Sequence, residues 1–265
     1  MVFPPLTWVL LVVAAALCAV GFYKFVYFMS VGYGLAVGGI GITILVIALV
    51  RGDVTPILAA LCLLMLIYGI RLGGFLLVRE MKSAAYRKTL NAQTDKPVPF
   101  PVKLVMWLFM AVLYTMQTCA VWYREACAPD GPQGTACVGA VIMALGICLE
   151  AIADKQKSDA KKLSPDKPAM TGLYRISRCP NYFGEITFWT GVFVSGWNIL
   201  VGAQWVIAIL GYVLILAIMI SGAQRLEKRQ NKNYGGMKEY RTYVEKTPIL
   251  IPFIPVYHLI KQDKE

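Results

Sequence analysis

The sequence contains very little histidine and no cysteine motif typical of a metal site. Its one histidine is His258, so we expect a mechanism that uses no histidine base. The seven cysteines show no C-x-x-C spacing, and five of them lie within or beside apolar segments, where thiols usually behave as small hydrophobic side chains. The sequence therefore predicts no metal site.

Glycine is frequent in one apolar segment, but the pattern of a dinucleotide-binding loop is missing. Five glycines lie between residues 32 and 41, yet they do not form a G-x-G-x-x-G match and no predicted strand precedes them. Gly34 and Gly38 have instead the four-residue spacing of small residues at close helix contacts in lipid. We therefore expect this segment to pack against another helix.

Charge is scarce in seven long apolar segments. The chain is 58% hydrophobic, with a mean hydropathy of +0.60, and a soluble domain of this composition would expose large apolar patches. Most of the segments approach the roughly 17–25 residues that cross a membrane. They are Leu6–Phe22, Val31–Val50, Ile57–Val78, Leu104–Tyr123, Thr135–Ala153, Ile186–Leu200 and Val201–Gly222. The sequence therefore predicts an all-α integral membrane protein with about seven transmembrane helices.

Acidic residues are fewer than basic ones, and the basic residues lie on one side of the predicted helices. The 26 lysines and arginines give a net charge of +11, which could suggest a nucleic-acid partner. However, 23 of them fall on one side, in Lys24, Arg79–Lys103, Lys155–Arg178 and Arg225–Lys264. The positive-inside rule assigns that side to the cytoplasm, where anionic lipid accounts for the charge. We expect no nucleic-acid partner, an N-terminus outside and a cytoplasmic C-terminus.

No linker rich in serine or glycine interrupts the chain, so we expect one membrane domain over residues 1–265. Its N-terminal helices occupy residues 6–78 and its C-terminal half residues 104–260. The loop Arg79–Pro101 and the stretch Lys155–Cys179 are expected in the cytoplasm, and prolines 165 and 168 should end the fifth helix. In the outward hairpin Arg124–Thr135 and its flank, Cys127 and Cys137 could form a disulfide or remain free thiols.

Polar side chains gather where the sixth predicted helix begins. The segment is Thr171-Gly-Leu-Tyr-Arg-Ile-Ser-Arg-Cys-Pro-Asn-Tyr-Phe-Gly-Glu185, and such a cluster at a membrane boundary indicates a ligand site. It resembles the R-H-P-N-Y-x-G-E signature of steroid 5α-reductases and bacterial DUF1295-type reductases, which is related to that of the sterol C14 and C7 reductases. Cys179 stands where the signature has histidine.

Weaker matches extend the resemblance over roughly Tyr68 to Pro255. Glu150-Ala-Ile-Ala-Asp-Lys-Gln-Lys157 is similar to the E-x-x-A-D-x-Q-K of bacterial members, and its two acids share one helical face. The segment Tyr68–Arg79 resembles the helix whose tyrosine contacts the substrate carbonyl, and Arg225–Pro248 resembles the C-terminal cofactor segment.

The resemblance implies a reductase that takes NADPH as cofactor and reduces a C=C bond conjugated to a carbonyl in a steroid or other lipid. Arginine and lysine suit the phosphates of NADPH, while its sugars and amide need Asn, Asp and Tyr. The implied phosphate ligands are Arg79, Lys161, Arg178, Arg225 and Arg229. The implied ribose or nicotinamide ligands are Glu150, Asp154, Asn181 and Tyr240, and Arg71 and Tyr182 complete the cofactor set. The implied catalytic residues are Tyr68, as donor to the carbonyl oxygen, and Glu185.

One departure concerns the substrate rather than the cofactor. Steroid 5α-reductases carry a supporting acid on an early helix, whereas Val31–Val50 holds no acid or amide here. Arg71 lies within a predicted span, where an unpaired charge costs ~2.5 kcal/mol or more. Glu150 is a candidate partner, and extension toward the cytoplasmic surface is the alternative. Lys161 and Arg229 can equally be positive-inside anchors.

Two other functions fit part of the pattern. Isoprenylcysteine carboxyl methyltransferases share a G-x-Y-x-x-x-R-H-P-x-Y signature but bind S-adenosylmethionine, and here Asn181 and Glu185 favour the reductase. A non-enzymatic lipid or steroid binder would leave the charges of Arg71 and Glu150 unexplained. The host membrane would be the bacterial cytoplasmic membrane, or the endoplasmic reticulum in a eukaryote.

The charge distribution makes a topology prediction. A reporter fused after Glu265 should lie in the cytoplasm, and a reporter fused near Pro129 should lie outside, because the two positions are separated by an odd number of spans. Compartment-specific reporter activity in intact cells measures this directly. Finding both reporters in one compartment would exclude seven spans.

Overall fold

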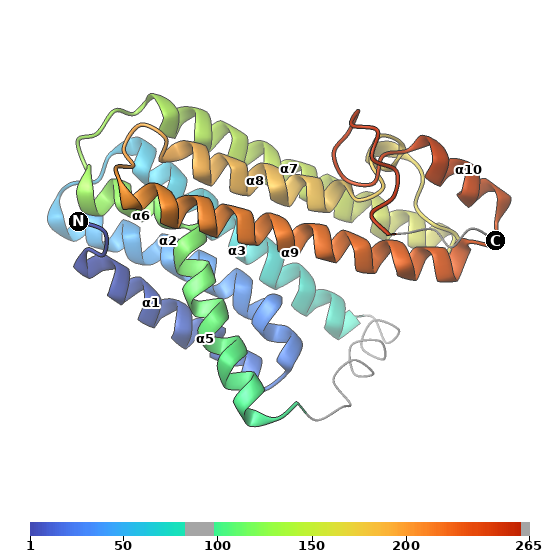
Figure 1. Cartoon of the computed structure of the whole chain (residues 1–265), viewed down its shortest axis with the longest axis horizontal. Coiled ribbons are helices and arrows are strands. Elements are labelled where there is room, and N and C mark those ends of the chain that lie inside the picture. The colour runs from blue at the N-terminus through green and yellow to red at the C-terminus, as the bar shows by residue number, and fades with distance from the viewer. Residues whose placement is uncertain (83–97, 261–265) are drawn as a thin grey trace. The chain divides into compact units, whose positions relative to one another are not determined.

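The computed structural model describes residues 1–82 and 98–260, and these residues form helices without any strand (Figure 1). Most of the predicted loop Arg79–Pro101 lies outside the described residues. The helices are α1 (Pro5–Cys18), α2 (Val31–Arg51), α3 (Pro56–Lys82), α5 (Phe100–Gln117), α6 (Cys119–Cys127), α7 (Gly134–Leu163), α8 (Pro180–Ser195), α9 (Ala203–Tyr234) and α10 (Lys238–Lys246), with 3₁₀ helices η1 (Ala19–Phe22), η2 (Phe25–Met29) and η3 (Gly172–Arg175).

The chain forms two compact units, and the divisions fall inside α7, α8 and α9. Unit 1 comprises Met1–Val141 and Gly191–Tyr212. Unit 2 comprises Ile142–Thr190 and Val213–Glu265. All candidate site residues from Glu150 onward belong to unit 2, whereas Tyr68, Arg71 and Arg79 belong to unit 1.

Six helices in the described residues are long and apolar enough to cross a membrane, close to the predicted number of about seven, and α8 is shorter, with 16 residues. This confirms the predicted all-α membrane architecture. The sixth predicted span, Ile186–Leu200, was misplaced, because α8 begins at Pro180, where the fixed φ of proline suits a first helical turn. The last residues of the signature, from Pro180 to Glu185, therefore lie in the first turns of a helix.

The fourth predicted span, Leu104–Tyr123, is divided into α5 and α6. The break lies at Thr118, whose hydroxyl donates to the carbonyl oxygens of Tyr114 and Thr115 at 2.8 and 3.1 Å. Such local side-chain bonds compete with the backbone ladder and bend helices. The fifth predicted helix, by contrast, ends as expected, since α7 continues to Leu163 and stops before Pro165.

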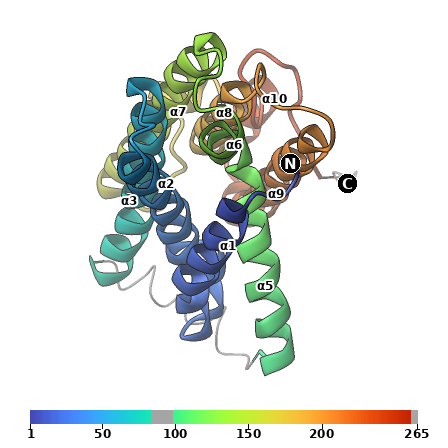
Figure 2. The same cartoon turned by 90° about the vertical axis from the view of Figure 1, so that its left-hand side faces the viewer.

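In unit 1, α2 and α3 lie side by side at the distance that only glycine permits (Figure 2). A Cβ added to Gly34 would lie 2.6 Å from the carbonyl oxygen of Gly69 and 2.8 Å from the nitrogen of Gly73. A Cβ on Gly69 would in turn lie 2.9 Å from the nitrogen of Gly38. The predicted helix packing through Gly34 and Gly38 is confirmed, and its partners are glycines of α3.

The hairpin that follows α6 is shorter than predicted. Arg124 was expected in a loop but lies in α6 and is buried, where its guanidinium donates to the carbonyl oxygens of Pro132 (3.0 Å) and Ser195 (2.8 Å). These carbonyl partners explain how a charge can be buried at this point of the fold. Cys127 and Cys137 are exposed, free thiols.

In unit 2, α7 and α8 also approach each other through glycine. A Cβ on Gly184 would lie 2.7 Å from Cγ of Glu150, and one on Gly146 would lie 2.7 Å from the carbonyl oxygen of Gly184. The glycine of the N-Y-x-G-E pattern is therefore required by the crossing of these helices, which brings Glu150 against the signature helix.

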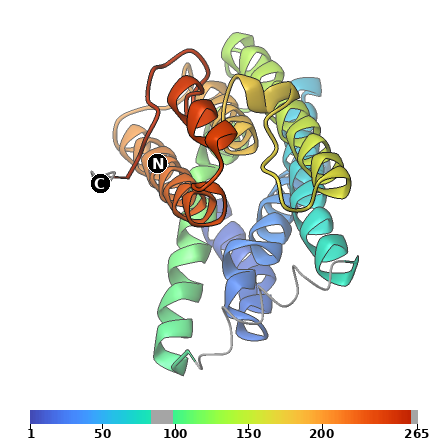
Figure 3. The ribbon, with the colours of Figure 1, turned by 90° about the vertical axis from the view of Figure 1, so that its right-hand side faces the viewer.

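Helix α10 packs against η3 (Figure 3). The hydroxyl of Tyr243 donates to the carbonyl oxygen of Tyr174 at 2.6 Å, and the hydroxyl of Tyr174 donates to the carbonyl oxygen of Ala153 at 3.3 Å. The partly buried Tyr243 and the buried Tyr174 thus connect α10, η3 and α7. The 3₁₀ helix η3, at the start of the signature segment, is therefore held by α10 on one side and by α7 on the other.

The close crossing of α2 and α3 at their glycines predicts how much stability is lost when one of these glycines gains a methyl group. Gly69→Ala should lower the free energy of unfolding by about 1–3 kcal/mol, because the new Cβ meets backbone atoms that cannot move independently. Thermal unfolding in detergent measures the change. Gly74→Ala is the matched control, since a Cβ there on the same helix has nothing within 4 Å. Equal melting temperatures for both variants would contradict a close contact at Gly69.

Candidate functional site

The signature turn before α8 is fastened to the chain that follows α10. The backbone N–H of Arg178 donates to the carbonyl oxygen of Pro248 at 2.9 Å, and the hydroxyl of Ser177 donates to the carbonyl oxygen of Leu250 at 2.8 Å. The same hydroxyl accepts the N–H of Cys179 at 3.2 Å. The backbone of the turn is therefore fixed by residues about 70 positions later in the chain.

Arg178 lies at the centre of a buried ion-pair network. Its side chain is 1% exposed, and Nη2 donates to Oε1 of Glu227 at 3.1 Å and to the carbonyl oxygen of Tyr257. Nδ1 of His258 lies 3.1 Å from Oε1 of Glu227, and the N–H of Leu259 donates to Oε2 at 3.0 Å. Glu227 of α9 thus holds both the signature arginine and the C-terminal segment.

Two further nitrogens of Arg178 are unused. Nε and Nη1 are buried and have no hydrogen-bond acceptor among the described residues. Buried donors are normally bonded, and a buried donor left without an acceptor costs about 1–3 kcal/mol of stability, more when it is charged. Two guanidinium nitrogens of the signature turn, two residues before the amino-terminal end of α8, are therefore buried without an acceptor among the described residues.

Two tyrosines of α10 lie close to this guanidinium. Burial raises the pKa of Tyr240 to about 12, and the positive charge of Arg178 opposes the rise. Burial also raises the pKa of Tyr243, again against the charge of Arg178. Both phenols therefore remain protonated at neutral pH, and each already donates its one O–H within unit 2, Tyr240 to Asn231 and Tyr243 to Tyr174.

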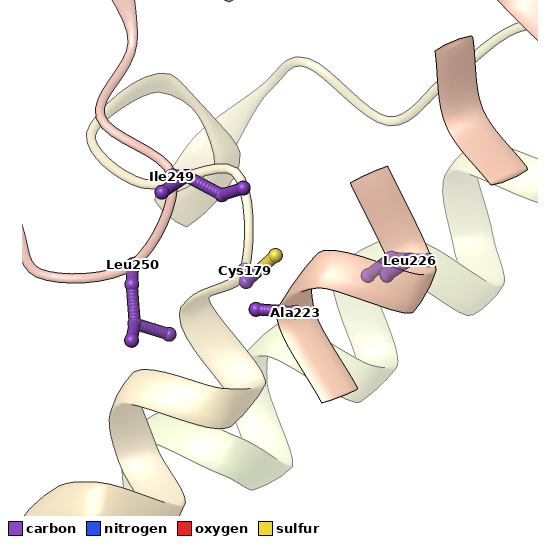
Figure 4. Packing of buried hydrophobic residues seen from close by; sticks show 5 residues of the cluster. All are labelled: Cys179, Ala223, Leu226, Ile249 and Leu250. Carbon is purple, nitrogen blue, oxygen red and sulfur yellow. The ribbon is translucent and has the colours of Figure 1, made fainter. Parts of the chain in front are cut away.

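Cys179, which replaces the signature histidine, is part of a small apolar cluster (Figure 4). The cluster consists of Cys179, Ala223, Leu226, Ile249 and Leu250. Burial raises the pKa of the thiol to about 12, so it is neutral at physiological pH and packs as a hydrophobic side chain. The substitution removes a titratable ring and leaves the turn packed against α9 and the C-terminal segment.

The first turns of α8 carry Asn181, Tyr182 and Glu185. Asn181 and Tyr182 are partly exposed, and Glu185 is buried. The ring of Tyr182 lies over α9, because a Cβ on Gly222 would meet it at 3.2 Å. The exposed Arg225 and Arg229 of α9 lie close enough for their charges to act on the Tyr182 phenol. The signature helix and two of the predicted phosphate ligands therefore belong to one region of unit 2.

Helix α7 brings its two acids to the same unit. Glu150 is buried against Gly184, and Asp154, one turn later, is partly exposed. Sequence analysis missed the role of Gln156, whose Oε1 accepts the N–H of Leu173 at 2.8 Å. The side-chain amide of Gln156 therefore fixes the start of η3. Gln156 is the glutamine of the E-x-x-A-D-x-Q-K match, and this position could have indicated from the sequence that it has a role.

Two predicted cofactor ligands make structural contacts. The ammonium group of Lys161 donates to the carbonyl oxygens of Pro165 (2.9 Å) and Lys167 (2.7 Å) and to the hydroxyl of Tyr234 (2.6 Å). It therefore holds the last turns of α7 to the segment that follows the helix and to Tyr234 of α9. The hydroxyl of Tyr240 donates to Oδ1 of Asn231 at 2.8 Å. Their assignment to the cofactor stays a prediction.

The remaining predicted residues lie on α3 in unit 1. Tyr68 is completely buried, and its hydroxyl donates to the hydroxyl of Tyr33 at 3.0 Å. Arg71 is partly exposed and Arg79 is exposed. The expected contact of Arg71 with Glu150 would join the two units and stays a prediction. Within the described residues there is no group of three or more His, Cys, Asp or Glu side chains that could hold a metal ion.

Comparison with known protein families gives a match over most of the chain. The sequence profile of a family described as protein of unknown function DUF1295 matches residues 33–247. No curated protein matches the chain, and no solved structure matches it. The matched stretch begins at Tyr33 in α2 and ends at Thr247, just after α10, so it includes the whole network around Arg178 except the C-terminal segment.

The ion pair of unit 2 predicts a large loss of stability when one partner is removed. Glu227→Ala should lower the free energy of unfolding by about 3–5 kcal/mol, because it leaves the Arg178 charge buried and unpaired. Denaturation in detergent measures the loss, with the exposed Glu245→Ala of α10 as the control.

Replacing both charges tests the reason for this loss. Arg178→Met combined with Glu227→Met should be less destabilised than Glu227→Ala alone, because no uncompensated charge remains. If Glu227→Ala were no more destabilising than Glu245→Ala, the buried pair would not stabilise unit 2.

Proposed function

We propose that this chain, which belongs to the steroid 5α-reductase-like DUF1295 family, is an NADPH-dependent membrane oxidoreductase. Its reaction would reduce a C=C bond conjugated to a carbonyl group in a steroid or another lipid. When bound, NADPH would supply the hydride for this reduction. The residues of the chain would bind the phosphates, orient the nicotinamide and polarise the carbonyl.

The observation that carries the proposal is the pair of unused nitrogens on Arg178. A guanidinium that is 1% exposed and has Nε and Nη1 without an acceptor suits a phosphate group, which can accept two parallel hydrogen bonds. The amino-terminal end of α8 adds favourable partial charge two residues later. Both features support an anionic ligand at the signature turn.

The other donors of unit 2 suit the remaining parts of NADPH. Arg225 and Arg229 are exposed on α9 near Tyr182 and would meet the second phosphate group of the ligand. Asn181 and Asp154 carry the amide and carboxylate that ribose hydroxyls and a carboxamide require. Arg71, Arg79, Lys161, Glu150 and Tyr240 complete the proposed cofactor set.

The proposed catalytic residues are Tyr68 and Glu185. The phenol of Tyr68 would donate to the carbonyl oxygen while negative charge grows there. Glu185 is buried, in the first turns of the signature helix, where it would order the nicotinamide side of the site.

An S-adenosylmethionine-dependent methyltransferase is the alternative proposal. That cofactor carries a carboxylate but no phosphate, so it would have less need of the three arginines at positions 178, 225 and 229 of unit 2. The unused donors of Arg178 and the exposed Arg225 and Arg229 therefore favour the phosphate-rich cofactor. A lipid binder without activity would leave these donors without a function.

Cofactor choice can be measured without knowing the substrate. NADPH should raise the melting temperature of the purified protein more than NADH does, because only NADPH carries the extra phosphate. S-adenosylmethionine should raise it least. A larger shift with S-adenosylmethionine than with NADPH would replace the reductase by the methyltransferase.

Asn181 provides a matched test of the binding site. Asn181→Ala should weaken NADPH binding by roughly 1–3 kcal/mol if one hydrogen bond to the cofactor is lost. Asn233→Ala, an exposed asparagine at the end of α9, should leave the affinity unchanged. Calorimetric titration measures both. Equal affinities of the two variants would remove the signature helix from the cofactor site.

A further inference from the structure

The close crossing of α2 and α3 brings two tyrosines together. Tyr33 and Tyr68 directly precede Gly34 and Gly69, the glycines whose backbones touch. The hydroxyl of Tyr68 donates to the hydroxyl of Tyr33 at 3.0 Å, and the two rings meet edge to face with centroids 5.9 Å apart. Because the backbones cannot separate without losing the crossing, the two hydroxyls are held in contact.

Tyr33 is itself fixed by a third tyrosine. Its ring stacks on that of Tyr114, with centroids 4.9 Å apart and an interplanar angle of 16°. The hydroxyl of Tyr114 donates to the carbonyl oxygen of Phe28 at 2.5 Å. All three tyrosines are buried, so the hydroxyl of Tyr33 has little freedom to move away from Tyr68.

A phenol with a second hydroxyl at its oxygen is a better donor than an isolated one. When Tyr68 turns its O–H toward a substrate carbonyl, its oxygen gains negative charge and can accept the O–H of Tyr33. Hydrogen bonds in such a chain strengthen one another in a low-dielectric interior. The remainder of α2 offers no acid or amide that could do this, since Val31–Arg51 contains neither.

We propose that Tyr33 is a positioning residue that orients the Tyr68 hydroxyl and stabilises it as a donor to the substrate carbonyl. This role rests on the proposed reductase function. The close crossing of α2 and α3 holds the two hydroxyls in contact, so Tyr33 fixes the position of the Tyr68 hydroxyl. No proton leaves Tyr33 in this step, and the hydroxyl only changes from acceptor to donor.

Fluorine NMR tests the contact without any activity. With 3-fluorotyrosine incorporated at position 68, Tyr33→Phe should change the chemical shift of the fluorine, because the hydroxyl of residue 68 loses its acceptor. Tyr123→Phe is the matched control, since Tyr123 is another buried tyrosine of unit 1 whose hydroxyl donates elsewhere, to the carbonyl oxygen of Val2 at 2.6 Å. An identical spectrum for Tyr33→Phe and wild type would overturn the proposal.

Kinetics separate a positioning role from a structural one. With NADPH and a 3-oxo-Δ4-steroid, or the enone lipid that wild type reduces best, Tyr33→Phe should lower kcat about tenfold, the scale of one lost hydrogen bond. The KM for NADPH and the activity of Tyr123→Phe should not change. Tyr33→Phe combined with Tyr68→Phe should be no slower than Tyr68→Phe alone, because Tyr33 acts through Tyr68.

The outcomes distinguish this proposal from the function on which it rests. Wild type that does not bind NADPH would overturn the reductase function and the role of Tyr33 together, even if the fluorine shift confirmed the contact. Normal NADPH binding and reduction with kcat of Tyr33→Phe at the wild-type value would overturn the role of Tyr33 alone. Independent, multiplicative losses in the double variant would also overturn it.

Discussion

The buried pair of Arg178 and Glu227 is the interaction on which unit 2 depends. Two charges that are almost fully removed from water are stable only because each meets its partner and further groups, here the carbonyl oxygen of Tyr257 and the N–H of Leu259. Through these contacts the signature turn, α9 and the C-terminal segment form one structure. A weaker arrangement would leave the turn free to move, and no ligand site could be built on it.

The residues of the signature have two different roles: some shape the turn and its helix crossing, and others remain partly exposed on α8. Ser177, Cys179 and Gly184 shape the turn and its helix crossing through hydrogen bonds, apolar packing and close approach. Asn181 and Tyr182 remain partly exposed on the first turn of α8. In Arg178, Nη2 holds the fold, while Nε and Nη1 have no acceptor among the described residues and are the donors that we propose for the cofactor. A spacing that resembles a binding motif is therefore also a folding motif.

The parts that sequence analysis predicted are those that depend on local pattern. The length of the apolar segments predicted membrane-spanning helices, the spacing of Gly34 and Gly38 predicted a close helix contact, and prolines 165 and 168 predicted the end of α7. The parts that it missed depend on partners distant in the chain. Glu227 lies among basic residues of the quoted Arg225–Arg229 segment, but nothing local shows that it meets Arg178, 49 positions earlier. The hydroxyl contact of Tyr33 with Tyr68 requires the crossing itself.

The pair of Tyr33 and Tyr68 also has a bearing on the absence of an acidic residue from α2. A carboxylate buried in an apolar helix pair must either be neutralised or find a cationic partner, and each solution restricts the surrounding side chains. A phenol is neutral, so burying it costs much less, provided that its hydroxyl is bonded. In unit 1 that condition is met, because Tyr68 donates to Tyr33 at 3.0 Å. The close glycine crossing and the pair of neutral tyrosines therefore depend on each other. Because the backbones of Gly34 and Gly69 touch, the hydroxyls of the neighbouring Tyr33 and Tyr68 can meet without the burial of a charge.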